Sequence, residues 1–156
     1  MADDLQAFHR QIAAETFNQC WTYIDKSELS ADDIEAMLAL AFTSYWHWQQ
    51  RDDATSRHLN ISLWQLGRVH NLAGRFDDAA RFGEKCVAVA LKNELSPFLL
   101  GYGYEVLAAA ALGNGDLEEA TKHLATARNC LARVEGEEDA GFLAADLDQI
   151  AQALKS

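Results

Sequence analysis

The sequence predicts an all-α fold of seven antiparallel helices. Apolar residues recur at the spacing of a helical face along nearly the whole chain. A single proline and nine glycines in 156 residues leave little turn chemistry for a many-stranded β fold. The chain is 49% hydrophobic and 24% charged, which excludes a disordered tail, and its length suffices for one substantial core. We therefore expect residues 1–156 to form a single helical domain.

Residues 1–50 predict the first pair of helices. The first helix runs to about Ile24 and ends in the polar segment 25–30. Ser30 is a favourable N-cap, and Asp33 three residues later adds negative charge to the first turn of a helix over 31–50. The apolar faces of these helices carry Leu5, Phe8, Ile12, Phe17, Cys20, Trp21 and Ile24, followed by Ile34, Met37, Leu38, Ala41, Tyr45 and Trp48.

Residues 57–93 predict the second pair. The polar run 51–56 separates this pair from the preceding helix, and a turn over 73–75 that contains Gly74 joins its two members. The apolar faces carry Leu59, Leu63, Leu66, Gly67 and His70, followed by Phe76, Ala79, Gly83, Cys86, Val87 and Ala90.

Residues 97–155 predict the last three helices. Ser96 is an N-cap that precedes Pro97 at the first helical position, where proline is tolerated. After the turn over 113–115, Asp116 caps the next helix, with Glu119 at the capping-box position. The charged segment that begins at Glu135 precedes a final amphipathic helix over 137–155.

An internal repeat relates the second pair of helices to the third. Aligning residues 66–80 with residues 107–121 places Leu66 on Leu107 and Gly74 on Gly115 at an offset of 41 residues. Both segments resemble the tetratricopeptide repeat (TPR) family, whose motif joins W-x2-L-G-x2-Y to a glycine turn and an alanine at the helix crossing. The matching residues are Leu66, Gly67, Gly74 and Ala79 in one segment, and Leu107, Gly115, Ala120 and Ala127 in the other.

This resemblance implies a TPR-like right-handed α-solenoid. It would comprise a divergent hairpin over 1–50, TPR-like hairpins over 57–93 and 97–134, and a C-terminal capping helix over 137–155. Segments 44–48, 64–69 and 102–110 also resemble segments of small bacterial proteins of this helical type. In TPR arrays the first helix of each hairpin lines a concave surface that binds proteins, so the resemblance implies a peptide or protein partner.

The charge of the chain disfavours nucleic acid as a partner. Acidic residues outnumber basic ones 24 to 13, which gives a net charge of −11. Phosphate backbones are bound mainly by Lys and Arg. Residues 51–92 are mildly basic, with five acids and seven bases, and lie between acidic flanks. We expect most charged side chains to lie on solvated helix faces.

The cysteines and the apolar segments indicate a cytoplasmic protein. The three cysteines Cys20, Cys86 and Cys130 form no CxxC motif, and their odd number argues against a disulfide framework. The sequence shows neither a signal peptide at its start nor a segment suited to cross a membrane. We therefore expect a cytoplasmic location and no membrane partner.

No known catalytic or metal-binding signature occurs in the sequence. The five histidines lack ligand spacing to cysteines or carboxylates. Acidic pairs such as Asp77-Asp78 and Glu118-Glu119 are explained by the helix dipole, which favours acids in first turns. We therefore expect a protein that is not an enzyme and that has neither a metal nor a cofactor.

Three polar side chains stand alone in stretches that are otherwise compatible with burial. Arg68 is the only formal charge between His58 and Gly74, and Glu105 is the only one between Leu95 and Gly115. A buried charge needs a partner, and the repeat alignment places both residues on first helices of successive hairpins, so we expect Arg68 and Glu105 to pair. The pair could be structural, or it could line a ligand pocket. His47 is the corresponding lone imidazole of the helix over 31–50.

The concave positions that the resemblance implies carry a basic and aromatic strip. Arg57 lies eleven residues before Arg68, on nearly the same helical face. With Trp64 and Asn71 these arginines would grip an extended peptide that carries an acidic group. The concave positions of the helix that begins at Pro97 include Tyr102 and Glu105, and Tyr102 would be a second apolar anchor beside Trp64.

Two functions fit these features. The leading hypothesis is a non-enzymatic adaptor that binds a peptide or protein segment along the concave face. The alternative is a sensor that binds a small anionic ligand or a signalling peptide in a pocket near His47, Arg68 and Glu105, between the second, third and fifth helices.

The aromatic residues of the helix over 31–50 point in several directions. Tyr45, Trp46 and Trp48 are too close in sequence to share one face, so Trp46 must contact something other than the main core. It could pack against a neighbouring helix, or it could belong to an exposed apolar patch that forms a homodimer or partner interface.

Overall fold

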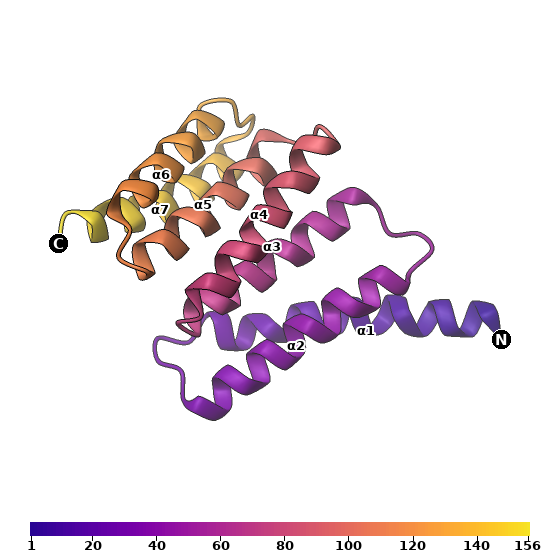
Figure 1. Ribbon diagram of the computed structural model, residues 1–156. Coiled ribbons are helices and arrows are strands. Elements are labelled where there is room, and N and C mark those ends of the chain that lie inside the picture. Colours follow the sequence, from indigo (N-terminus) through magenta and orange to yellow (C-terminus); the bar gives the residue numbers. More distant parts are fainter.

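Seven α-helices and no strand make up the computed structural model, which describes residues 1–156 (Figure 1). The predicted all-α fold with seven helices is therefore confirmed. None of the helices has the length and apolar character that crossing a bilayer requires. The helices are α1 (Ala2–Ile24), α2 (Ala31–Gln50), α3 (Ser56–Leu72), α4 (Phe76–Lys92), α5 (Pro97–Gly113), α6 (Leu117–Leu131) and α7 (Glu137–Leu154).

Local capping determines where most of these helices begin. The Ser30 hydroxyl accepts a hydrogen bond from the Asp33 amide, and the Asp33 carboxylate accepts one from the Ser30 amide, which completes a capping box. Ser96 and Asp116 cap α5 and α6 as predicted. The α3–α4 and α5–α6 turns each contain a glycine with positive φ, 71° at Gly74 and 78° at Gly115. A residue with a Cβ is strained in that conformation, which explains why the repeat has glycine at both places.

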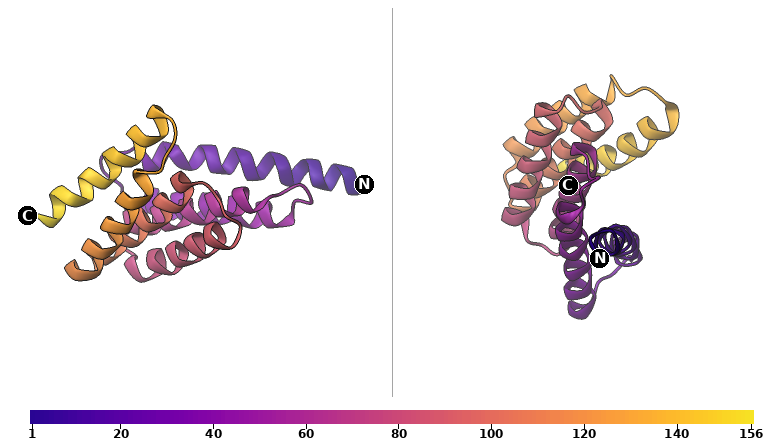
Figure 2. Two further views of the ribbon diagram at one scale, coloured as in Figure 1. Left: turned by 90° about the horizontal axis from the view of Figure 1, so that it is seen from above. Right: turned by 90° about the vertical axis from the view of Figure 1, so that its right-hand side faces the viewer.

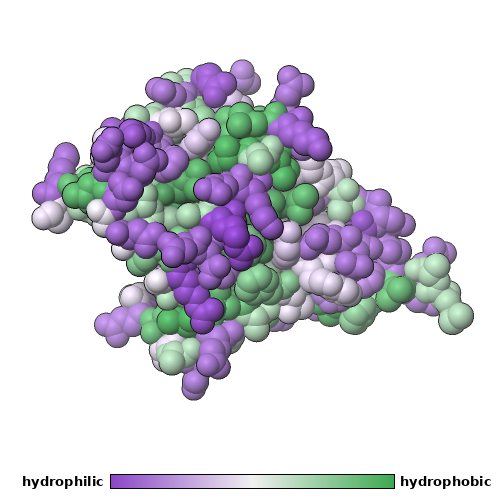
Figure 3. Space-filling model, viewed as in Figure 1, coloured by the Kyte–Doolittle hydropathy of each residue, from purple (hydrophilic) through white to green (hydrophobic).

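Successive helices pack against each other, and the odd-numbered helices form a layer. Helix α3 packs on α5, α5 packs on α7, and the C-terminal part of α1 reaches α3. Viewed from above, α1 and α7 lie on one side of the molecule and α4 and α6 on the other (Figure 2). The even-numbered helices face the viewer in Figure 1, and hydrophilic and apolar side chains are interspersed over that face (Figure 3).

The core has two clusters of buried side chains. The first cluster lies among the four helices α1, α2, α3 and α4 and includes Met37, Leu66 and Phe82. The second lies among α5, α6 and α7 and includes Leu124 and Leu147. Close approach of α3 and α5 connects the two halves. A Cβ at position 67 would lie 2.5 Å from Val106 Cγ1, so glycine is required where these helices cross.

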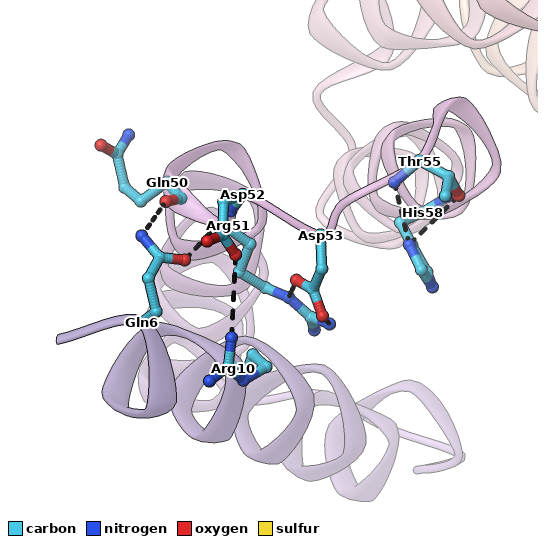
Figure 4. A network of polar contacts seen from close by, with 8 residues as sticks. All are labelled: Gln6, Arg10, Gln50, Arg51, Asp52, Asp53, Thr55 and His58. Atoms are coloured by element: carbon cyan, nitrogen blue, oxygen red, sulfur yellow. Dashed lines mark hydrogen bonds and ion pairs between the residues drawn. The ribbon is translucent and has the colours of Figure 1, made fainter. Parts of the chain in front are cut away.

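A network of polar contacts joins the first half of α1 to the end of α2 and the loop that follows it (Figure 4). Gln6 donates to the carbonyl oxygen of Gln50 at 3.0 Å and accepts from the amide of Asp52 at 3.0 Å. The Arg10 guanidinium lies 3.7 Å from the Asp52 carboxylate. These contacts hold α1 across α2, and so position its C-terminal end, which carries Trp21, next to α3.

Candidate functional site

A pocket of about 510 Å³ opens on the face formed by the odd-numbered helices. Its walls come from α1, α3, α5 and α7, and in the right-hand view of Figure 2 α1 and α7 lie on either side of that face. The apolar lining consists of Trp21, Ile61, Trp64, Phe98, Leu99, Tyr102 and Phe142. The polar lining consists of Asp25, Arg57, Asn60, Arg68 and Asp146.

Four aromatic rings form a continuous wall of this pocket. The Trp21 and Trp64 ring centroids are 5.7 Å apart, and those of Trp64 and Tyr102 are 5.6 Å apart in an edge-to-face arrangement. Tyr102 in turn packs edge-to-face on Phe98 at 5.1 Å. These separations lie in the favourable range for aromatic pairs. The four residues, here called the aromatic wall, extend across three helices and present apolar surface to the pocket.

Beside the aromatic wall lies a polar cluster of Arg68, Glu105, Asp146 and the Tyr102 hydroxyl. Arg68 Nη1 donates to Glu105 Oε1 at 3.2 Å, so the predicted pair of these two residues is confirmed. Arg68 Nη2 lies 3.8 Å from Asp146 Oδ1 on α7, and Tyr102 Oη donates to Asp146 Oδ2 at 2.8 Å. The cluster therefore ties α3, α5 and α7 together, and Asp146 is the member that sequence reasoning missed.

Burial perturbs the titration of this cluster. Glu105 is 3% exposed, and burial raises its pKa to about 7 even though the Arg68 guanidinium opposes the shift. The charge of Asp146 also raises the pKa of Glu105. The pKa of Tyr102 is raised by burial and by its hydrogen bond to Asp146. A single guanidinium thus faces two carboxyl groups in a site with little access to solvent.

A second pocket, of about 350 Å³, continues the same face beyond the polar cluster. Arg68 and Asp146 line both pockets, and Glu105 and Asn71 line only the second. The amide of Asn71 donates to the carbonyl oxygen of Val106 at 3.1 Å, so its donor is used within the protein. The polar cluster therefore divides one long depression into two compartments.

Unpaired polar atoms concentrate at these pockets. Six buried side-chain nitrogen or oxygen atoms have no hydrogen-bond partner in the protein, and five of them belong to residues that line the two pockets. Such atoms destabilise a fold by about 1–3 kcal/mol each, and native proteins contain few of them. The five atoms are Asn60 Oδ1, Trp64 Nε1, Arg68 Nε, Asn71 Oδ1 and Glu105 Oε2.

The structure corrects the prediction of a basic strip. Arg57, Trp64 and Arg68 do line one pocket, with Arg57 exposed at its edge. However, the charge of Arg68 is directed at Glu105 and Asp146, so this side chain is not a free cation. The strip is less basic than predicted because Arg68 is paired with Glu105, as expected, and because α7 also places the Asp146 carboxylate near it, a contact that the sequence pattern did not indicate.

The predicted location of His47 is also wrong. His47 does not reach Glu105, because α2 makes no contact with α5, and it lines neither of the pockets that Arg68 lines. Its Nδ1 instead lies 2.9 Å from Nδ1 of His9 on α1, in a hydrogen bond between the two rings. The two pockets that Arg68 lines contain no residue of α2, and α1 and α7 take the place that was expected for α2.

Trp46 both packs against a neighbouring helix and remains exposed, which are the two alternatives that the sequence left open. Its ring lies 5.8 Å from that of His9, so it packs on α1, yet the residue remains 53% exposed. Phe8, which directly precedes His9 on α1, is 51% exposed. Homodimer formation through this surface stays a prediction.

The cysteines are buried as free thiols, and burial raises the pKa of Cys20 and of Cys86 to about 12. No three side chains of His, Cys, Asp or Glu are grouped so that they could hold a metal ion. Comparisons with protein-family models, with curated proteins and with solved structures find no match to this chain.

Proposed function

We propose that this protein is a non-enzymatic adaptor that binds a peptide segment of a partner protein along the face formed by α1, α3, α5 and α7. In this proposal the chain is a short TPR-like right-handed solenoid, in which α7 caps three helical hairpins. The first helices of the hairpins then line the concave side, where the pocket lies. The repeat of the glycine turns at Gly74 and Gly115 supports this arrangement.

The aromatic wall is the observation that carries the proposal. It offers a broad apolar surface on rigid helices, next to polar atoms that lack partners in the protein. Aromatic residues at the centre of a binding surface contribute most of the affinity in many protein complexes. The volume of about 510 Å³ lies within the range of ligand pockets, so it can admit side chains of a peptide whose backbone lies across the opening.

The structure gives less support to the alternative of a sensor for a small anion. A buried anion site needs a cation that is free to pair with the ligand. Arg68 already faces two carboxyl groups, and Arg57 lies at the exposed edge. We therefore retain the peptide-binding proposal alone.

A library of random peptides displayed on phage tests this proposal. Peptides selected on the wild-type protein would be labelled, and their affinities measured by fluorescence anisotropy. Phe142 lines the pocket and is 58% exposed, so Phe142→Ala removes contact area without opening the core. We expect this variant to weaken binding about tenfold, which corresponds to about 1.4 kcal/mol.

Phe8→Ala provides a matched control. Phe8 is similarly exposed at 51% but lies on the other part of α1, against His47. We expect its replacement to leave the affinity unchanged. The proposal fails if no peptide is enriched, or if the selected peptides bind the Phe142→Ala variant as tightly as the wild type.

A further inference from the structure

We propose that the pocket beside the aromatic wall receives a basic side chain, Lys or Arg, whose cation lies between the Asp146 carboxylate and the faces of Trp64 and Tyr102. This inference rests on the proposed function and names the chemistry of the segment that binds. It reverses the preference for an acidic peptide that the sequence indicates.

Acidic groups outnumber basic ones in the polar cluster. The cluster contains one cation, Arg68, and two carboxyl groups, those of Glu105 and Asp146. The side chains of these three residues are 25%, 4% and 22% exposed, so solvent screens them only in part. An unbalanced charge is costly in such a place. When Glu105 is ionised, the cluster carries one surplus negative charge, and a second cation would neutralise it.

The oxygen that such a cation would reach is Asp146 Oδ1. Tyr102 donates to Asp146 Oδ2, whereas Asp146 Oδ1 lies 3.8 Å from Arg68 Nη2, too far for a hydrogen bond. Oδ1 therefore has an acceptor site without a hydrogen-bond donor. Asp146 lines the same pocket as the aromatic wall, so a ligand inserted along the rings can reach this oxygen.

The faces of aromatic rings attract cations. A guanidinium or ammonium group within about 6 Å of a Trp or Tyr ring gains about 0.5–2 kcal/mol, most where water is excluded. The aliphatic part of a Lys or Arg side chain would at the same time cover the apolar surface of Trp64. At the pocket edge, Arg57 and Asp25 are both exposed and carry opposite charges, so they do not reverse the preference of the interior.

The charge of the whole protein acts in the same direction. A net charge of −11 attracts basic segments and speeds their association at low salt. An anionic ligand would have to overcome this field and would meet Asp146 inside the pocket.

Small blocked amino acids test the inference directly. N-acetyl-arginine methylamide, the norleucine analogue and the glutamate analogue would each be titrated into the protein labelled with ¹⁵N, and the indole N–H signal of Trp64 followed by NMR. We expect the arginine probe to shift this signal with an affinity about tenfold higher than that of the norleucine probe, and the glutamate probe to bind more weakly still.

Asp146→Asn removes the charge and keeps an oxygen that can accept from Tyr102. We expect this variant to lose most of the preference for the arginine probe over the norleucine probe, keeping only the part that the aromatic faces supply. Asp148→Asn, an exposed position on the same helix that faces Arg128, is the control and retains the preference for arginine.

The proton of Glu105 should make the affinity for the arginine probe depend on pH. A purely structural role of the polar cluster would give no such dependence. The charged groups that act on Glu105 are Arg68 of α3 and Asp146 of α7, and Cys86 of α4 and Tyr102 of α5 are further titratable neighbours. A bound cation favours ionised Glu105. The affinity for the arginine probe should therefore rise between about pH 6 and about pH 8.

Several results would overturn the inference. One is equal or tighter binding of the norleucine or glutamate probe. Another is a preference for arginine that Asp146→Asn leaves undiminished, and a third is the lack of any shift of the Trp64 signal. Selected peptides that depend on Phe142 but lose nothing when their Lys and Arg residues are replaced by norleucine would also refute it. That last result would leave the proposed function intact.

Discussion

Replacing Glu105 by Gln should change stability more favourably at about pH 8 than at about pH 4. Burial raises the pKa of Glu105 from 4.5 to about 7, so the folded protein holds the proton more tightly than the unfolded chain does. The contribution of this group to stability is fully present below about pH 4.5 and is lost as the pH rises through 7. The shift of about 2.5 pKa units corresponds to a loss of up to about 3 kcal/mol. Gln has no charge to bury and can still accept a hydrogen bond from Arg68.

Urea unfolding followed by circular dichroism at several pH values measures this effect. The difference in the free energy of unfolding between Glu105→Gln and the wild type should shift in favour of the variant by up to about 3 kcal/mol between about pH 4 and about pH 8. The titration of groups that do not interact with Glu105 cancels in this difference. Glu84→Gln, at an exposed site on α4, should give a flat difference. A flat difference for Glu105→Gln would show that the carboxyl group titrates normally, and the reasoning about the polar cluster would be wrong.

Three further predictions concern other parts of the structure. Arg68→Ala leaves the Glu105 carboxylate buried without its cation. We therefore expect urea titration to show a loss in the free energy of unfolding of about 3–5 kcal/mol near pH 8, and a smaller loss near pH 5, where Glu105 is protonated. Equal losses at the two pH values would contradict the pairing. Gly67→Ala places a methyl group 2.5 Å from Val106 Cγ1 and should destabilise the protein by about 1–3 kcal/mol in the same assay. The double variant with Val106→Ala should recover part of this loss. The three buried thiols should react with Ellman's reagent only after unfolding, because burial excludes the reagent and raises the pKa of Cys20 and Cys86; fast labelling of the native protein would disprove this.

The helices were predictable from the sequence because their signals are local. Ser30, Ser96 and Asp116 cap helices through hydrogen bonds to residues three positions away, and the glycine turns lie within single hairpins. The start of α3 was less evident. Thr55 caps this helix in a box completed by the His58 ring, whose Nδ1 accepts from the Thr55 amide, and histidine is not the usual residue at that position.

The site was predictable only in part because it depends on contacts between distant helices. The pairing of Arg68 with Glu105 followed from the repeat, which relates the helices that carry them. Asp146 lies on α7, outside the repeat, so nothing in the sequence placed it against Tyr102 and Arg68. Trp21 packs on the core of the first hairpin as expected, and it also contributes to the pocket from the end of α1. Its contact with Trp64 depends on how α1 crosses to α3, which no local pattern specifies.

The aromatic wall spans the boundary between the two core clusters. Trp21 and Trp64 pack on the cluster of α1 to α4, whereas Phe98 and Tyr102 pack on the cluster of α5 to α7. A molecule bound across all four rings would therefore act as a clamp on both halves of the protein at once. Thermal opening of either half would then require the bound molecule to leave first, so occupancy should make the two halves melt as a single unit.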